Sequence, residues 1–503
     1  MGIGPIVGLG GANSARILLE VDSKNNDPKL VLQTDNEPGK LTDPPIINLQ
    51  EKSIDAPYER RQLYGRGYLF SLSNLDEKVC YKFGFMNGTG KAVLPGSTGR
   101  FRTVPAVMTE PVSFILTSCN NYDAYNDIAM YAHIWDDLAE LIENDPSIRM
   151  IIHSGDQVYC DKVWDTATEN YFNDTRGMAR KQKREWCERH AGIWTQKYRG
   201  VYREAWEHPS AHRVLSSIPN VMMWDDHDVH DGYGSHPTDF WPAQRYLAKI
   251  ACNVFDQLQA SLNPIPNMGS DNRAFYEKLL GCHFIVLDTR SCRNSKKKKL
   301  LGAQQWRRLR QIIASIEPNS GPVFLVSSTP VMNFALRGGF LSKIIKIVGS
   351  AVGNLKDDLI DAWDSDANCH EMKDLLEELQ NALARGVGPI TVLSGDIHVH
   401  HIAKWWHEET PELLVNQVTA SPLTNCPLGN WGFDITYKKE HIGVPLELLG
   451  DYYGLASWIR NKRGYAQIAL DPNMPTGKRI KVRFRFEERL GEPLQSTNWR
   501  DLT

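Results

Sequence analysis

The segment that decides the fold reads Ile148-Arg149-Met150-Ile151-Ile152-His153-Ser154-Gly155-Asp156-Gln157-Val158-Tyr159. It starts as a short apolar run typical of a buried strand, and a Gly-Asp pair follows. Three more apolar runs lead into polar residues in the same way, at Ser118-Cys119-Asn120-Asn121, Asp225-Asp226-His227-Asp228 and Gly395-Asp396-Ile397-His398. Because the carboxyl ends of strands in α/β sheets converge on one crevice, we expect these segments to share a site.

Outward from these strands, residues 106–503 alternate between apolar strands and amphipathic helices. Strand candidates lie at 112–116, 284–287, 323–326 and 390–393, and helical periodicity marks 130–142, 304–316 and 371–383. This alternation predicts a layered α/β (α+β) domain over 106–503. Residues 160–218 are expected to be a mostly helical insertion.

The first 105 residues have a different pattern. Short β-prone runs at 15–21, 68–72 and 80–85 are separated by Gly, Pro, Asn and Asp, and no useful helical period interrupts them. We therefore expect a separate N-terminal β-sandwich domain over 1–105.

Composition sets the remaining limits. The chain has 503 residues, a net charge of -3, 42% hydrophobic and 23% charged residues, which fits a soluble globular protein and gives no indication of nucleic acid as a structural partner. There is no secretory apolar region and no run of ~20 apolar residues, so we expect a cytoplasmic protein or a mature secreted form. Nine scattered cysteines show no disulfide framework. The oligomeric state stays open.

The polar residues at the strand ends suit metal ions. Carboxylates bind hard cations, imidazole binds transition metals, and a thiolate or phenolate suits a trivalent or softer centre. Several carboxylates in one pocket repel each other unless cations neutralise them, and Asp156 could bridge two ions. Taken singly, each motif has a simpler interpretation as a turn, a helix N-cap or a buried cysteine; their coincidence at strand ends favours a metal site.

These motifs resemble the metallophosphoesterase superfamily, and more closely its alkaline phosphatase D (PhoD-like) branch. Ser118-Cys119 stands where the superfamily has its first aspartate, Asp226 where it has asparagine, and Gly395-Asp396-Ile397-His398 replaces the first histidine of the last motif. The spacing from Asp156 to Tyr159 is similar to that of purple acid phosphatases. The resemblance implies a β-sandwich core flanked by helices, with an N-terminal all-β domain of fibronectin or immunoglobulin type.

The resemblance also implies a set of ligands and cofactors. Ferric iron (Fe3+) is expected at Cys119, Asp156, Tyr159 and the Asp396/His398 motif. Calcium (Ca2+) is expected nearby, sharing Asp156 and reaching further carboxylates. The sequence leaves open whether Asp226 or Asp231 reaches it; Asp231 is otherwise a candidate for substrate binding.

The expected activity is metal-dependent hydrolysis of phosphate esters, as an alkaline phosphatase or phosphodiesterase, by a metal-bound hydroxide. His227 is the candidate to protonate the leaving group or contact the phosphate, and Asp228 could orient its ring. Arg290 could pair with phosphate or form a surface salt bridge. The alternatives are a phosphodiesterase specialised for lipid or nucleotide diesters and an inert binding protein on the same fold.

Three further features lie outside this site. The amphipathic stretch from Gly339 to Leu355 could touch lipid, but we favour a lid or a packed helix. Lys296-Lys297-Lys298-Lys299 is expected to be a solvated loop. Five aromatic residues of the insertion are expected to pack between helices or to form a cleft wall: Trp186, Trp194, Tyr198, Tyr202 and Trp206.

Overall fold

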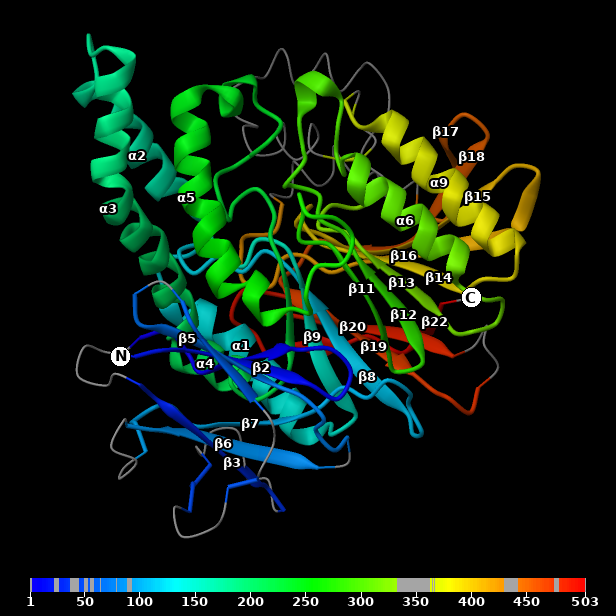
Figure 1. Cartoon of the computed structure of the whole chain (residues 1–503). Helices are drawn as coiled ribbons and strands as arrows, with labels where there is room; N and C mark the ends of the chain where they lie inside the picture. Colours follow the sequence, from blue (N-terminus) through cyan, green and yellow to red (C-terminus); the bar gives the residue numbers. More distant parts are fainter. Residues whose placement is uncertain are drawn as a thin grey trace.

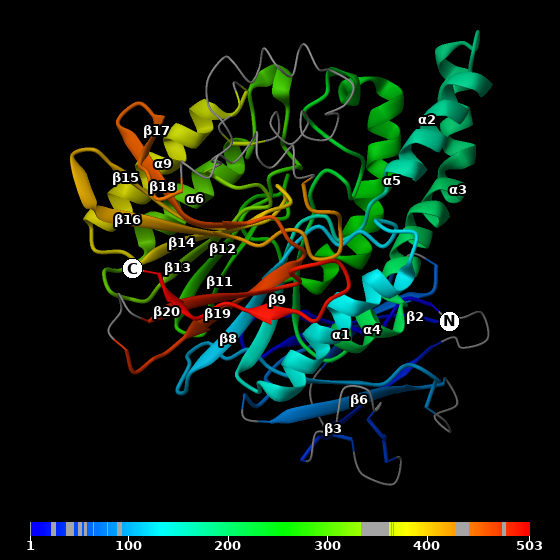
Figure 2. The ribbon, with the colours of Figure 1, turned by 180° about the vertical axis from the view of Figure 1, so that it is seen from behind.

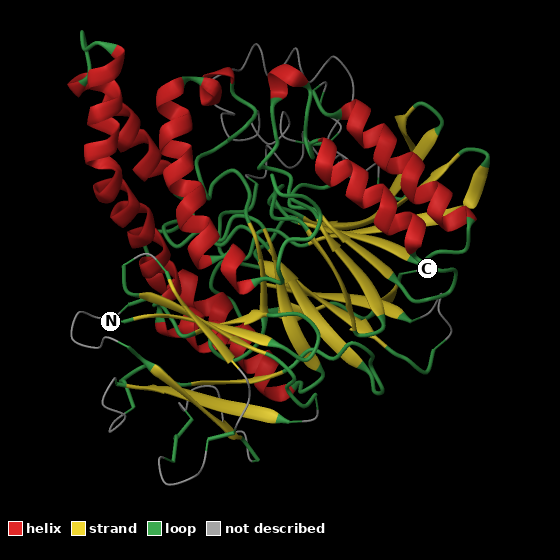
Figure 3. Ribbon diagram, in the orientation of Figure 1, coloured by secondary structure: helices red, strands yellow, loops and turns green. Residues whose placement is uncertain are grey.

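The computed structural model describes residues 2–502 except 22–26, 37–44, 49–52, 55–57, 64, 78, 88–92, 333–361, 364, 366, 429–441 and 475–478. Two large sheets pack face to face, and helices cover their outer faces (Figure 1). Figure 2 shows the same layers from behind, and Figure 3 separates helices from strands. The amphipathic stretch from Gly339 lies outside the described residues.

The first sheet holds eleven strands in the described part of the chain, in the order β21-β20-β19-β8-β9-β10-β1-β2-β5-β4, with β22 paired to β20. Neighbours β8, β9, β10 and β1 run parallel. The bounds are β1 Ile6–Leu9, β2 Ala15–Glu20, β4 Tyr58–Gln62, β5 Gly67–Leu72, β8 Val112–Thr117, β9 Ile148–Ser154, β10 Asn220–Met223, β19 Gly464–Leu470, β20 Ile480–Phe486, β21 Gln495–Ser496 and β22 Arg500–Asp501.

The second sheet has the order β11-β12-β13-β14-β16-β15-β18-β17, with β12, β13, β14 and β16 parallel. Its bounds are β11 Phe275–Leu279, β12 Cys282–Val286, β13 Val323–Val326, β14 Ile390–Ser394, β15 His400–His407, β16 Thr410–Thr419, β17 Leu446–Leu449 and β18 Tyr452–Arg460. Phe114 of the first sheet packs edge-on against Phe284 and Phe324 of the second, with ring centroids 5.7 and 5.3 Å away. These rings help to fill the core between the sheets.

Helices form the two outer layers. The first sheet is covered by α1 Ile128–Asn144, α3 Arg180–Trp206, α4 Pro209–Leu215 and α5 Pro242–Leu258, and the second by α6 Ala303–Ser315 and α9 Cys369–Ala384. Helix α1 begins where the Asp127 side chain accepts a hydrogen bond from the Ala129 N–H. Short 3-10 turns lie at η1 Pro237–Phe240, η2 Ala260–Leu262 and η3 Ser295–Lys297. The predicted β-sandwich core flanked by helices is confirmed.

The N-terminal region contains strands throughout its described part. Strands β3 Lys29–Thr34, β6 Cys80–Met86 and β7 Gly99–Arg102 form a small sheet that packs on β2 and β5 through an apolar cluster. However, β1 pairs in parallel with β10, so the first strands also extend the large sheet. The immunoglobulin-like character and the domain boundary at 105 stay predictions.

The insertion between β9 and β10 is helical, as expected: α2 Asp161–Asp174 is followed by α3 and α4. The five aromatic residues singled out in its sequence are buried, which supports helix packing: Trp186, Trp194, Tyr198, Tyr202 and Trp206. The lysines from Lys296 to Lys299 are exposed, as predicted for a solvated loop. Each of the nine cysteines is a free thiol. None of the described helices combines the length and apolar character needed to cross a bilayer.

Candidate active site

The ends of parallel strands from both sheets meet at one place. The polar residues after β8, β9, β10 and β14 come together as predicted, and the segments after β12 and β13 join them. Two glycines allow this close approach: a Cβ atom on Gly155 would lie 2.9 Å from Cβ of Asp225, and one on Gly395 would clash with Ser118. Glycine is therefore needed where the two sheets close on each other.

The backbone turns sharply at these strand ends. Cys119, Asp156, Asp396 and His398 have φ angles of 56, 53, 70 and 54°. Residues other than glycine rarely adopt this left-handed region, and each costs on the order of 1–3 kcal/mol. Such conformations cluster at functional sites, where the surrounding structure holds side chains in directions that the chain would otherwise avoid.

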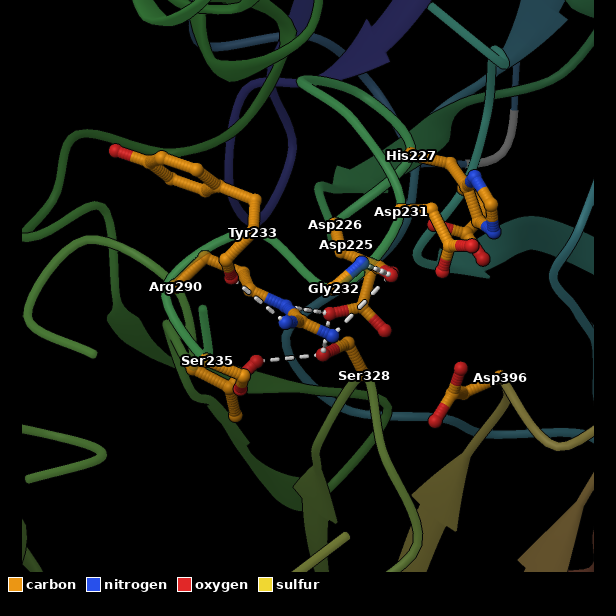
Figure 4. A network of polar contacts seen from close by, with 12 residues as sticks. Asp225, Asp226, His227, Asp231, Gly232, Tyr233, Ser235, Arg290, Ser328 and Asp396 are labelled. Carbon is orange, nitrogen blue, oxygen red and sulfur yellow. Dashed lines mark hydrogen bonds and ion pairs between the residues drawn. The ribbon is translucent and has the colours of Figure 1, made fainter. Parts of the chain in front are cut away.

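A buried acidic cluster forms the centre of the site. Asp156, Asp225, Asp226 and Asp396 each offer a carboxylate oxygen within 4.8 Å of the others, and Asp156 and Asp226 form a second such group with His227. Figure 4 shows the carboxylates of Asp225, Asp226 and Asp396 beside one another. Burial and the charge of Asp226 raise the pKa of Asp156 well above its usual range.

This cluster fits metal ions. Oδ1 of Asp156 is buried and has no hydrogen-bond partner among the described residues. A buried carboxylate oxygen without a donor is costly in an apolar interior, but a cation would stabilise it. Several carboxylates at this spacing are the ligands that hard cations take.

The softer predicted ligands lie on one side of Asp156. Sγ of Cys119 is 3.5 Å from Oδ2 of Asp156 and 3.4 Å from the carbonyl oxygen of Asp396. Tyr159 Oη lies 3.5 Å from Nε2 of His398. Burial and the neighbouring acids raise the pKa of the Cys119 thiol, and burial lowers the pKa of His398 to about 4. His398 is therefore neutral near pH 7, the form that binds a metal.

Arg290 lies behind the acidic cluster and is 1% exposed. Its guanidinium contacts the carboxylate of Asp225, lies 3.3 Å from Oδ1 of Asp226 and donates to the carbonyl oxygen of Tyr233 at 3.0 Å (Figure 4). The interpretation as a surface salt bridge is wrong, because the pair is fully buried. Arg290 is also not among the residues that line the pocket, so this geometry gives no support to a direct phosphate contact.

The carboxylate beside His227 belongs to Asp161, a residue that the sequence did not single out. Nδ1 of His227 lies 3.0 Å from Oδ2 of Asp161, and the ring packs against Tyr159 at a tilt of 32°, with centroids 4.2 Å apart. The expected partner, Asp228, instead accepts hydrogen bonds from the Asp225 N–H and from Gln259. The carboxylate placed to orient the His227 ring is therefore that of Asp161, whereas the side chain of Asp228 bonds to Asp225 and Gln259.

A local signal for Asp161 exists, although it is weak. It is the first residue of α2 and follows Tyr159 by two positions, so a ligand at Tyr159 brings Asp161 close to the site. Asp228 is adjacent to His227 in sequence, but the chain turns after Asp226, whose carbonyl oxygen accepts the N–H groups of Val229 and His230. This turn separates the two side chains.

The site opens into a pocket of about 810 Å³. Asp231 lines this pocket, and its backbone N–H donates to Asp161 at 2.7 Å. Six aspartates and four histidines contribute to the lining, and none of the described lining residues is a lysine or arginine. Positive charge for an anionic substrate therefore has to come from bound cations or from protonated histidine.

The chain is similar to known proteins in sequence and in fold. The PhoD-like phosphatase family matches residues 114–471. An uncharacterized protein of Saccharomyces cerevisiae is 22% identical over 360 residues, covering 59% of this chain and 51% of its own length. The chain thus spans about half the length of this curated relative.

Two solved structures share the fold. PhoD superposes with a TM-score of 0.63 at 15% identity, covering 99% of this chain and 91% of PhoD. A purple acid phosphatase from yellow lupin (Lupinus luteus) seeds has a TM-score of 0.57 at 10% identity, covering 98% of this chain and 73% of the lupin protein.

Proposed function

The chain belongs to the PhoD-like phosphatase family, and from this premise we propose that it hydrolyses phosphate esters with bound metal ions. The observation that carries the proposal is the group of four buried carboxylates within 4.8 Å of each other, at strand ends that both sheets contribute. The mixed sheets and flanking helices match a fold that serves phosphatases. An inert binding protein would have no need for this costly cluster.

The ligand set supports two unlike metal ions, Fe3+ and Ca2+. Cys119, Tyr159 and His398 would hold iron with Asp156 and Asp396, and Asp156 would be shared with calcium. Asp226 belongs to both groups of close carboxylates, whereas Asp231 belongs to neither, which favours Asp226 as the calcium ligand. Bound ions would supply the positive charge that lysine and arginine do not provide in the described pocket lining, and they would lower the pKa of water so that hydroxide is available to attack phosphorus.

His227 is suited to protonate the leaving oxygen. Although burial opposes a charge on the ring, Asp161 and Asp226 raise the pKa of His227 well above its usual value. These two carboxylates therefore favour the protonated imidazole. Asp161 holds Nδ1, which leaves Nε2 to donate into the pocket that the ring lines.

The charge of the pocket favours diesters over monoesters. A phosphodiester carries one negative charge, whereas a monoester carries close to two at pH 7, and six aspartates line the pocket. Its volume of about 810 Å³ leaves room for an organic group on each side of phosphorus. We expect a higher kcat/KM for bis-para-nitrophenyl phosphate than for para-nitrophenyl phosphate.

The test combines metal analysis with hydrolysis assays on Asp156→Asn and on a matched control, Asp451→Asn. Asp451 is exposed in the turn between β17 and β18, outside the site. We expect the wild type and Asp451→Asn to bind metal and cleave the diester, and Asp156→Asn to lose at least about 100-fold in kcat/KM. Full activity of chelator-treated Asp156→Asn would refute the proposal. A wild-type protein that binds no metal and hydrolyses neither ester would refute it as well.

A further inference from the structure

A second pocket lies at the far end of the helical insertion. The C-terminal end of α2 and the N-terminal ends of α3 and α5 enclose about 610 Å³. We call it the tip pocket, lined by Tyr171, Phe172, Met178, Arg180, Lys183, Arg184, Cys187, Trp241, Pro242, Ala243 and Tyr246. None of the acidic cluster contributes to it.

Large aromatic side chains stay at the surface of this tip. Phe172 is 46% exposed and Trp241 is 50% exposed, although Tyr171 and Trp186 beneath them are buried. Tyr171 contacts both Phe172 and Trp186, with ring centroids 5.4 and 5.6 Å away. The exposed Phe172 ring therefore rests on a buried aromatic base. Trp and Phe are residues that enter the headgroup region of a bilayer.

Basic side chains surround the same aromatic residues. Arg184 is paired with Glu188 at 2.8 Å, but Arg180 and Lys183 have no carboxylate within salt-bridge distance in the part of the chain that the structure describes. These two cations stand in a protein whose net charge is -3. A partner for the exposed aromatic rings and for these two cations needs an apolar interior beneath a negatively charged surface. An anionic lipid bilayer has both.

The position of the tip suits such a partner. Figures 1 and 2 show the ends of α2 and α3 standing away from both sheets. The tip pocket and the acidic pocket approach each other at the start of α5, where Gln244 lines the acidic pocket and the neighbouring Ala243 lines the tip pocket. A surface that contacts the tip therefore lies on the part of α5 that the two pockets share.

We propose that the tip pocket docks the protein on an anionic phospholipid bilayer. Trp241 and Phe172 enter the headgroup region, and Arg180 and Lys183 contact lipid phosphates. This docking does not depend on the proposed hydrolysis, and it involves a segment other than the amphipathic stretch from Gly339.

The experiment measures sedimentation of the full chain with vesicles of phosphatidylcholine alone and of an equimolar mixture with phosphatidylglycerol. We expect binding to the mixed vesicles that weakens as salt is added. The double variant Arg180→Gln with Lys183→Gln should bind about 30-fold more weakly, which corresponds to ~2 kcal/mol at 1.4 kcal/mol per factor of ten. The single variants Phe172→Ser and Trp241→Ser should each bind the mixed vesicles more weakly than the wild type.

The matched control removes the same charges elsewhere, in Lys278→Gln with Arg307→Gln. Both side chains are exposed, on β11 and α6. Wild-type binding by the control, with unchanged circular dichroism for all variants, supports the proposal. Equal losses in both double variants, equal binding to both kinds of vesicle, or binding of dodecyl phosphate without binding to vesicles would each overturn it.

Discussion

The buried guanidinium of Arg290 allows a direct test of how the acidic cluster is held. Its side chain contacts the carboxylates of Asp225 and Asp226, and none of it reaches solvent. Arg290→Met removes the cation but keeps an apolar chain of similar length. Since removal of one member of a buried ion pair costs about 3–5 kcal/mol, we expect that loss in the free energy of unfolding of the metal-free protein.

Added metal should reduce the loss. Cations bound at the front of the cluster replace part of the missing charge, and they stabilise the folded state to which they bind. The assay is urea unfolding followed by circular dichroism, with a chelator and with Fe3+ and Ca2+. Arg310→Met is the control, because Arg310 pairs with Asp374 and Glu378 at the surface and should cost no more than about 1 kcal/mol.

A direct phosphate contact by Arg290 would behave differently. In that case Arg290→Met would bind the substrate more weakly, so KM would rise while the free energy of unfolding stayed unchanged. If metal-free Arg290→Met unfolds at the same urea concentration as the wild type, the structural role assigned to Arg290 is refuted.

Three more predictions concern the site and its supports. Asp161→Asn should lower kcat/KM by about 10- to 100-fold and move the alkaline limb of its pH profile to lower pH, because His227 loses the charge that raises its pKa; an unmoved limb would contradict this. Gly395→Ala should lower the free energy of unfolding by about 1–3 kcal/mol, measured in urea, since its Cβ has no room; wild-type stability would show that the strand ends can separate. Burial lowers the pKa of His400 to about 3, so stability is present above about pH 6.5 and is lost as pH falls towards 3, by about 1.4 kcal/mol per unit. His400→Phe should reduce this acid sensitivity in thermal unfolding between pH 7 and 4, and an identical pH dependence would count against the assignment.

The sequence was informative where a local pattern determines structure. The apolar stripe predicted at 130–142 belongs to α1, and the strand that runs into Gly155 is β9. The site residues could be grouped because strand ends converge, and Cys119, Asp156 and Asp396 do meet. The family resemblance, which rests on these motifs, is confirmed by the match over residues 114–471.

Pairing between distant segments could not be predicted. The four residues of β1 carry no mark that places them beside β10 rather than in a separate domain. Arg290 follows a strand, as a surface arginine often does, and its burial depends on Asp225, far away in sequence. Adjacency in sequence favoured Asp228 as the partner of His227, and only the turn after Asp226 shows why Asp161 lies beside the ring instead.

The carboxylates of the acidic cluster need positive charge both behind the cluster and on its pocket side. Four carboxylates lie within 4.8 Å of each other, and in the described part of the chain the groups that can offset their charge are the guanidinium of Arg290 and the imidazole of His227, whose pKa is raised. Two positive charges cannot balance four ionised carboxylates, which is consistent with a pKa of Asp156 well above its usual range. Arg290 fixes Asp225 and Asp226 from behind but leaves the pocket side open, and the described pocket lining offers no lysine or arginine there. The fold thus places a permanent cation, Arg290, behind the cluster where no substrate can reach. The unbalanced negative charge of the carboxylates faces the pocket, where a metal ion can bind and offset it and a phosphate ester can bind in turn.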